Sequence, residues 1–236
     1  FSTIHRVNVS VLNPVVYADV LLVDDDGGQA YELWYTQALT ANGEDFDLVS
    51  VDSNADGPGA DRLKEARVVV WLTGEEDEGT LTTADVAALS SFLDAGGALF
   101  LTGQDIGRDL TSEGTVTSGF MRDYLRADFV SDNANVFDLI AVEGEDISGG
   151  VNVSIEGGTG ALNQNYPSEV QPRGGAAVVY LYNSTAEAAV KFANSNFRTV
   201  YFAFGFEGIS DRQDRNRVMG NVIDWLLDNG TTGDNL

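Results

Sequence analysis

One stretch decides the fold of this chain: Leu99-Phe100-Leu101-Thr102-Gly103-Gln104-Asp105-Ile106-Gly107. An apolar run stops at a glycine, two polar residues follow, and a second glycine comes soon after. This pattern is typical of a buried parallel strand that enters a sharp turn at the carboxyl edge of its sheet. Hydrolases with such a turn, called a nucleophile elbow, place their nucleophile on it. Here that position is Gln104, and the chain contains no cysteine.

The elbow strand is the last of several short apolar runs that alternate with helical patterns. Apolar runs bounded by turn residues predict strands at 19–24, 46–51, 67–72 and 98–102. Apolar spacing predicts helices at 31–42 and 83–95, with a short helix around 60–66. Thr82 and Asp85 resemble a capping box at the start of the second helix. The βαβαβαβ order indicates a parallel sheet with helices on both faces.

The second half of the chain is less regular. A helix is predicted at 120–125, short strands at 137–142, 151–155, 176–182, 188–192 and 199–204, and a closing helix at 217–227. Residues 157–175 are predicted to form a loop. We expect one domain over 17–230, preceded by a linker or strand at 1–16 and followed by a frayed tail at 231–236. Because the chain begins with Phe1, we expect it to be a piece of a longer protein, with neighbouring domains as partners.

Charge is the strongest signal in the composition. The 236 residues include 37 acidic and 13 basic ones, for a net charge of −24. This surface excludes nucleic acid and anionic lipid as partners, and no apolar run approaches the ~20 residues of a membrane span. Aspartate-rich, lysine-poor surfaces suit high salt, where screening removes self-repulsion. Together with the absence of cysteine, this favours an extracellular or cell-surface location.

Ligands of open α/β sheets bind at the carboxyl ends of the strands. Residues 24–28, 103–107 and 205–207 follow predicted strands and should meet at that edge. The candidate pocket consists of Asp24, Asp25, Asp26, Gly27, Gly28, Thr73, Gly103, Gln104, Asp105 and Glu207. Within it, Asp24, Asp26 and Asp105 are candidate ligands of a divalent cation, Mg²⁺ or Ca²⁺. A solvated turn before a helix is the alternative for Asp24 and Asp26.

The order of elements resembles the class I glutamine amidotransferase-like fold of long secreted bacterial and archaeal proteins, over about residues 19–228. The segments that carry the resemblance are residues 22–27, 71–74, 101–107, 163–169 and 201–207. It implies a flavodoxin-like parallel sheet, with extra antiparallel strands in the C-terminal half.

Active members of that family carry a Cys-His-Glu triad. The cysteine position is Gln104, the His-x-Glu position retains only Glu207, and the sole histidine is His5. An amide cannot attack an acyl group, and no nearby histidine could activate a serine or water. The sequence therefore predicts a module without amidotransferase catalysis, whose small-molecule ligand is not identified.

A second resemblance is to haloacid dehalogenase-like phosphatases, which depend on Mg²⁺. Asp24 would be the nucleophile and Asp26 the acid/base, with Thr73 as the second motif and Asp105 and Asp109 as the acidic fourth motif. The basic motif would have to be Lys64, which precedes the Thr73 strand instead of following it.

Residues 52–57 also resemble the start of a calcium loop. Its twelfth position is Leu63, where a glutamate is needed, so we expect an Asp/Gly turn there.

Overall fold

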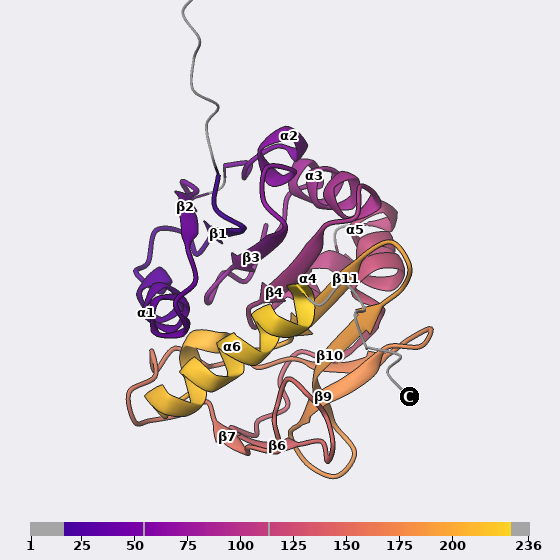
Figure 1. Cartoon of the computed structure of the whole chain (residues 1–236). Coiled ribbons are helices and arrows are strands. Elements are labelled where there is room, and N and C mark those ends of the chain that lie inside the picture. Colours follow the sequence, from indigo (N-terminus) through magenta and orange to yellow (C-terminus); the bar gives the residue numbers. More distant parts are fainter. Residues whose placement is uncertain (1–16, 54, 113, 228–236) are drawn as a thin grey trace, which may run out of the picture.

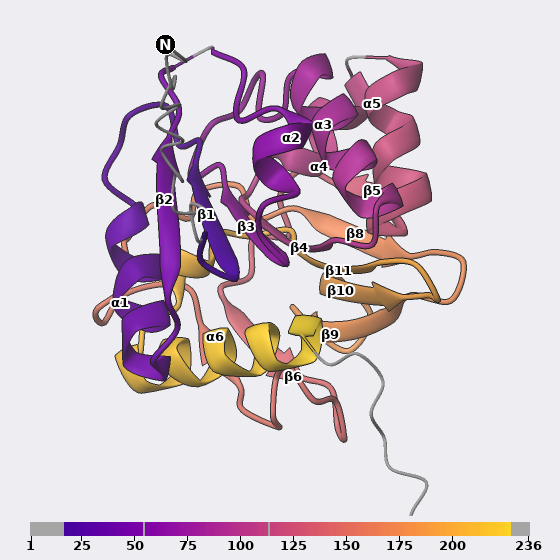
Figure 2. The same ribbon diagram turned by 45° about the horizontal axis from the view of Figure 1, so that its top comes forward.

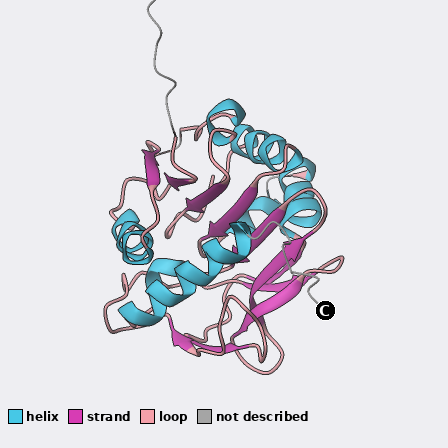
Figure 3. Ribbon diagram, in the orientation of Figure 1, coloured by secondary structure: helices cyan, strands magenta, loops and turns pink. Residues whose placement is uncertain are grey.

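The computed structural model of this chain describes residues 17–53, 55–112 and 114–227. The expected linker at 1–16, the expected tail at 231–236 and His5 lie outside the described residues. The described part is an α/β structure in which one large mixed sheet is covered by helices (Figures 1 and 3). This confirms the predicted fold class.

The first half of the sheet is parallel. Its strand order is β2-β1-β3-β4-β11, and each neighbouring pair runs in the same direction. With β11 counted as the fifth strand, this is the 2-1-3-4-5 order of flavodoxin-like folds. The strands are β1 (Val20–Asp24), β2 (Phe46–Ser50), β3 (Val68–Leu72), β4 (Ala98–Thr102) and β11 (Arg198–Phe202).

Beyond β11 the sheet continues with antiparallel strands. They are β10 (Glu187–Ala193), β9 (Ala177–Leu181), β6 (Asp138–Ala141) and β7 (Val153–Ser154). Two strands were not predicted: β5 (Ala127–Ser131) and β8 (Glu169–Pro172), which pair with each other. The expectation of a continuous loop at 157–175 is therefore wrong, because β8 also pairs with β10.

Helices cover both faces of the parallel half, as Figure 2 shows. One face carries α1 (Glu32–Asn42) and α6 (Arg212–Leu227). The other carries α2 (Ala60–Leu63), α3 (Thr83–Asp94), α4 (Ile106–Ser112), α5 (Thr115–Phe120) and the π-helix η1 (Met121–Leu125). Neither α4 nor α5 was predicted from the sequence. None of the helices within 17–227, gaps at 54 and 113 aside, combines the length and apolarity needed to cross a bilayer.

The core strands are continuously apolar because each is buried on both faces. Leu22, Phe100 and Phe202 contact the α1/α6 side, whereas Val23 and Leu101 contact the α3 side. All of these side chains are fully buried. Alternation along each strand thus divides the apolar residues between two helix layers.

Local signals at the helix ends agree with the sequence. Gly43 ends α1 in the left-handed conformation, with φ of 78°, and its N–H bonds to carbonyls of the last turn. Thr82 and Asp85 form the predicted capping box: Asp85 N–H donates to Thr82 Oγ1 and Thr82 N–H donates to Asp85 Oδ2. These caps fix where α1 ends and where α3 begins.

Candidate ligand site at the carboxyl edge of the sheet

The strands β1, β3, β4 and β11 end at the same edge, so the loops that follow them lie together. A fifth segment, residues 163–167 between β7 and β8, joins these four loops through hydrogen bonds to Gln104 and Glu207. The sequence motif at 163–169 contributed to the family resemblance, but its residues were not among the candidate site residues.

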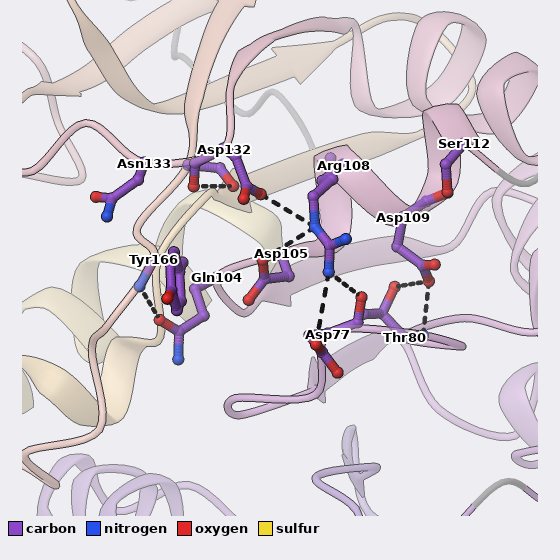
Figure 4. Close-up of polar contacts among 12 residues, drawn as sticks. Asp77, Thr80, Gln104, Asp105, Arg108, Asp109, Ser112, Asp132, Asn133 and Tyr166 are labelled. Carbon is purple, nitrogen blue, oxygen red and sulfur yellow. Dashed lines mark hydrogen bonds and ion pairs between the residues drawn. The ribbon is translucent and has the colours of Figure 1, made fainter.

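Gln104 occupies the elbow and is 1% exposed. Its Oε1 accepts hydrogen bonds from the backbone N–H groups of Asn165 (2.8 Å) and Tyr166 (2.7 Å), and its Nε2 donates to Asn163 O (2.9 Å). Figure 4 shows the Gln104 amide turned toward the Tyr166 segment. The side chain at the nucleophile position therefore holds the 163–166 segment in place.

Glu207 lies in the short 3₁₀ helix η2 (Phe206–Gly208) after β11 and is fully buried. Its Oε2 accepts from Tyr35 Oη at 2.6 Å, and its Oε1 accepts from Asn163 Nδ2 at 2.7 Å and Gln164 Nε2 at 3.3 Å. Burial raises the pKa of this carboxyl, and the bonds from Asn163 and Tyr35 oppose the rise. The side chains of Tyr35, Asn163 and Gln164 thus hold the Glu207 carboxylate.

Gln164 joins the strand end to this buried network. Its Oε1 accepts from Gly205 N–H at 2.7 Å while its Nε2 donates to Asn163 Oδ1 at 2.8 Å. A Cβ at Gly205 would stand 2.0 Å from Glu207 Oε1 and 2.5 Å from Gln164 Nε2. Only glycine fits between them, which explains the residue type at this position.

Asp24 and Asp26 lie on the α1 side of the sheet edge. Asp26 is 1% exposed, and its two oxygens accept backbone hydrogen bonds from Gly28 and Tyr31, each at 3.0 Å. Asp24 is 6% exposed; burial and then the nearby Asp26 charge raise its pKa from 3.8 to about 6. Ligand oxygens of Asp24, Asp26 and Glu32 lie within 4.8 Å of one another. The third carboxylate of this cluster is thus Glu32, which the sequence did not single out.

Asp25 faces the opposite side of the sheet. Its Oδ2 accepts from Trp71 Nε1 at 3.0 Å, and burial raises its pKa to about 7. Gly27, two residues further on, has a φ of 73°, and a Cβ there would overlap Glu76 Oε1. Gly28 also has a positive φ, 85°, but with open space around it. The turn at 24–28 therefore brings Asp24 and Asp26 together and separates Asp25 from them.

Asp105 is 3% exposed and belongs to a different cluster. Arg108 Nε lies 3.3 Å from Asp105 Oδ1 and 3.1 Å from Asp132 Oδ1, so one guanidinium lies between two carboxylates (Figure 4). Burial and the Asp132 charge raise the pKa of Asp105 to about 7, although Arg108 opposes the rise. Asp105 contacts Arg108, whereas Asp24 and Asp26 group with Glu32.

Thr73 and Gly103 pack against each other at the start of the elbow, where β3 and β4 end. Thr73 is fully buried, and a Cβ at Gly103 would stand 2.0 Å from its Oγ1. Among the described residues Thr73 Oγ1 has no hydrogen-bond partner. The close contact between β3 and β4 ends therefore requires glycine at the start of the elbow.

The phosphatase-like arrangement is not favoured by these positions. Asp109 accepts from Thr80 N–H (2.8 Å) and Thr80 Oγ1 (2.9 Å), which makes it an anchor for the loop before α3. Lys64 donates to Ser91 Oγ and lines a cavity with Ala98, the first residue of β4, so it lies at the amino edge of the sheet. Lys64 and Asp109, the residues of the supposed basic and acidic motifs, thus lie away from the Asp24 cluster.

Residues of the segment 52–57, which resembles the start of a calcium loop, form hydrogen bonds with the beginning of α3. Asp56 Oδ1 accepts from Thr82 Oγ1 at 2.7 Å, and Gly57 N–H donates to Asp85 Oδ1 at 2.7 Å. Asn54 lies outside the described residues. The described part of this turn packs on the start of α3.

The strand order and the helices on both faces define the class: a flavodoxin-like α/β fold. No family model and no curated protein matches the sequence. Solved structures do match. A ThuA-like protein from Bacteroides uniformis aligns with 95% of this chain and 98% of its own, at 13% identity and a TM-score of 0.58.

Two longer proteins share the fold over part of their length. An exo-β-1,4-mannosidase from an Opitutaceae bacterium matches 89% of this chain but only 36% of its own, at 14% identity and a TM-score of 0.56. The carbohydrate deacetylase Agd3 matches 89% of this chain and 32% of its own, at 16% identity and a TM-score of 0.58. The present chain thus spans about a third of these two proteins and nearly all of the ThuA-like one.

Proposed function

We propose that this chain is a non-catalytic amidotransferase-like module of a larger secreted protein, with a ligand site at the carboxyl edge of its sheet. The observation that carries the proposal is the set of hydrogen bonds made by Gln104. Both ends of its amide are bonded to the 163–166 segment. The elbow position therefore supports the edge of the site and presents no attacking group.

The rest of a triad is also missing. Acyl transfer from glutamine by this fold needs a thiolate and a base that activates it. The sequence has no cysteine, and its only histidine is His5. Glu207, the one triad residue type that is retained, has both carboxylate oxygens bonded to Tyr35, Asn163 and Gln164. Its role is structural in this proposal.

The longer neighbours support the idea of a module. In both the mannosidase and the deacetylase, the matching region is about a third of the chain. We infer a comparable setting here, in a protein that processes carbohydrate, with the present fold supporting or assisting a separate catalytic domain. The cysteine-free sequence and the net charge of −24 support an extracellular setting for that protein.

Enzyme assays test the non-catalytic part of the proposal. Ammonia release from glutamine and hydrolysis of aryl ester, amide and phosphate substrates are measured for the wild type and for Gln104→Cys. We expect no turnover above background for either, because the added thiol has no histidine to activate it. Glutaminase activity in the wild type would overturn the proposal. So would Mg²⁺-dependent phosphatase activity that is lost in Asp24→Asn, since this would favour the phosphatase alternative.

A further inference from the structure

Within the described part of the chain, two buried oxygens of the acidic cluster formed by Asp24, Asp26 and Glu32 have no hydrogen-bond partner. They are Asp24 Oδ1 and Glu32 Oε2, each with less than 1 Å² of accessible surface. Asp24 as a whole is 6% exposed. A buried carboxylate oxygen that reaches neither protein donor nor solvent is costly, by roughly 1–3 kcal/mol or more. Among the described residues these two oxygens therefore lack a positively charged or hydrogen-donating partner, whereas both Asp26 oxygens accept backbone N–H groups.

The neighbouring charged residues do not supply a positive partner for Asp24, Asp26 and Glu32. The nearest charges that act on Asp24 are those of Asp26 and Glu32, and both are negative. The ion pairs within the described part of the chain leave all three residues without a lysine or arginine partner. Two buried carboxylates, Asp24 and Asp26, beside the partly buried Glu32 destabilise the fold when no cation lies among them. A bound cation would remove that cost.

The three residues are also placed close together by the fold before any ligand arrives. Asp24 is the last residue of β1, Glu32 is the first residue of α1, and Asp26 is fixed by the N–H groups of Gly28 and Tyr31. Because the ligand oxygens already lie within 4.8 Å of one another, little reorganisation is needed to surround one ion.

We propose that Asp24, Asp26 and Glu32 bind one hard divalent cation, Ca²⁺ or Mg²⁺. Both ions prefer carboxylate oxygens, and water completes their coordination. The inference deepens the proposed function by naming the ligand class of the carboxyl edge, on the α1 side of Gln104. The cation proposal and the proposed function can fail independently, because a module without catalysis could lack the ion and an enzyme could hold it.

Calorimetric titration tests the proposal. Protein stripped with EDTA is titrated with CaCl₂ and, separately, with MgCl₂ in about 0.15 M KCl, which screens diffuse binding to the acidic surface. We expect saturable binding of one ion per chain for at least one of the two salts. Glu32→Gln is expected to weaken the binding by roughly tenfold or more, since it removes one ligand.

The control is Asp138→Asn, which removes the same charge from an exposed position on β6. It should bind the ion as the wild type does. Circular dichroism of each variant checks the fold, and if Glu32→Gln does not fold, Asp24→Asn replaces it. Anomalous density in crystals soaked with Mn²⁺ supplies a second measurement. Absence of saturable binding to the wild type, or equal weakening by Glu32→Gln and Asp138→Asn, would overturn the proposal.

Discussion

Tyr35 Oη donates a 2.6 Å hydrogen bond to Glu207 Oε2, and both side chains are fully buried. This bond joins α1, near the start of the chain, to the turn after β11. Tyr35→Phe leaves the Glu207 carboxyl with one donor fewer, and we expect the free energy of unfolding to fall by about 1–3 kcal/mol. Urea denaturation measures the change.

The matched control is Tyr31→Phe, because the Tyr31 hydroxyl bonds to Glu75 at an exposed site. Loss of an exposed bond should cost well under ~1 kcal/mol. Equal effects of the two substitutions would show that the buried Tyr35–Glu207 bond is not a main support of the site.

Gln104→Ala tests the role of the elbow residue. The change leaves the N–H groups of Asn165 and Tyr166 and the Asn163 carbonyl without their partner. We expect a loss of about 2–3 kcal/mol in unfolding free energy and faster amide hydrogen exchange at residues 163–167. Unchanged exchange at that segment would contradict the assignment of Gln104 as its anchor.

The Asp105 carboxyl predicts a pH dependence of stability. Its pKa is about 7 in the folded protein, against an ordinary value of 3.8, because of burial and the Asp132 charge. The folded state therefore holds the proton more tightly than the unfolded state does. Its contribution to stability is present at low pH and is lost as the pH rises toward and through 7.

Asp105→Asn removes this titration. Between about pH 5 and about pH 8, we expect the wild type to lose more unfolding free energy than the variant does. Exposed Asp138→Asn should follow the wild-type profile and corrects for the general effect of net charge. Parallel profiles for wild type and Asp105→Asn would rule out the raised pKa as a source of the pH dependence.

Two glycines with left-handed backbones allow the cost of backbone strain to be separated from the cost of a steric clash. Gly74 has a φ of 56° and Gly79 a φ of 68°. A Cβ at Gly74 would lie 2.7 Å from the Tyr31 ring and 3.0 Å from Asp26 Cβ, whereas nothing lies within 4 Å at Gly79. Gly79→Ala should cost about 1–2 kcal/mol from backbone strain alone. Gly74→Ala should cost about 1–3 kcal/mol more, because Tyr31 and Asp26 must move; equal midpoints in urea would contradict this.

The predictable part of the fold is the part in which local pattern and tertiary setting agree. The strands around Leu22 and Phe100 are continuously apolar because both faces are covered. Of the elements that were not predicted, α4 and β8 both have weak local patterns. Thr, Ser and Gly weaken the helical pattern of α4, and the polar residues and Pro172 of β8 form a strand only because β5 and β10 pair with them.

The candidate site was predictable to a similar degree. The rule that parallel strands end at one edge places Asp24, Gln104 and Glu207 in neighbouring loops, as the structure does. Alternation along a strand explains why Asp25 turns to the other face, although it had been expected in the same pocket as Asp24. Glu32 and Gln164 enter the site through tertiary contacts, and no spacing rule in the sequence signals these.

The acidic composition predicts that thermal stability depends on salt concentration. With 37 acidic and 13 basic residues, the folded chain repels itself more at low ionic strength than at high ionic strength. Since the Debye length shrinks to about 3 Å at 1 M salt, we expect the melting temperature to rise from low to molar NaCl. Thermal unfolding followed by circular dichroism, with EDTA present to remove divalent ions from the Asp24 cluster, measures the effect. A flat or falling curve would show that the composition is no adaptation to salt, and a rise seen only without EDTA would assign the stabilisation to the cation site instead.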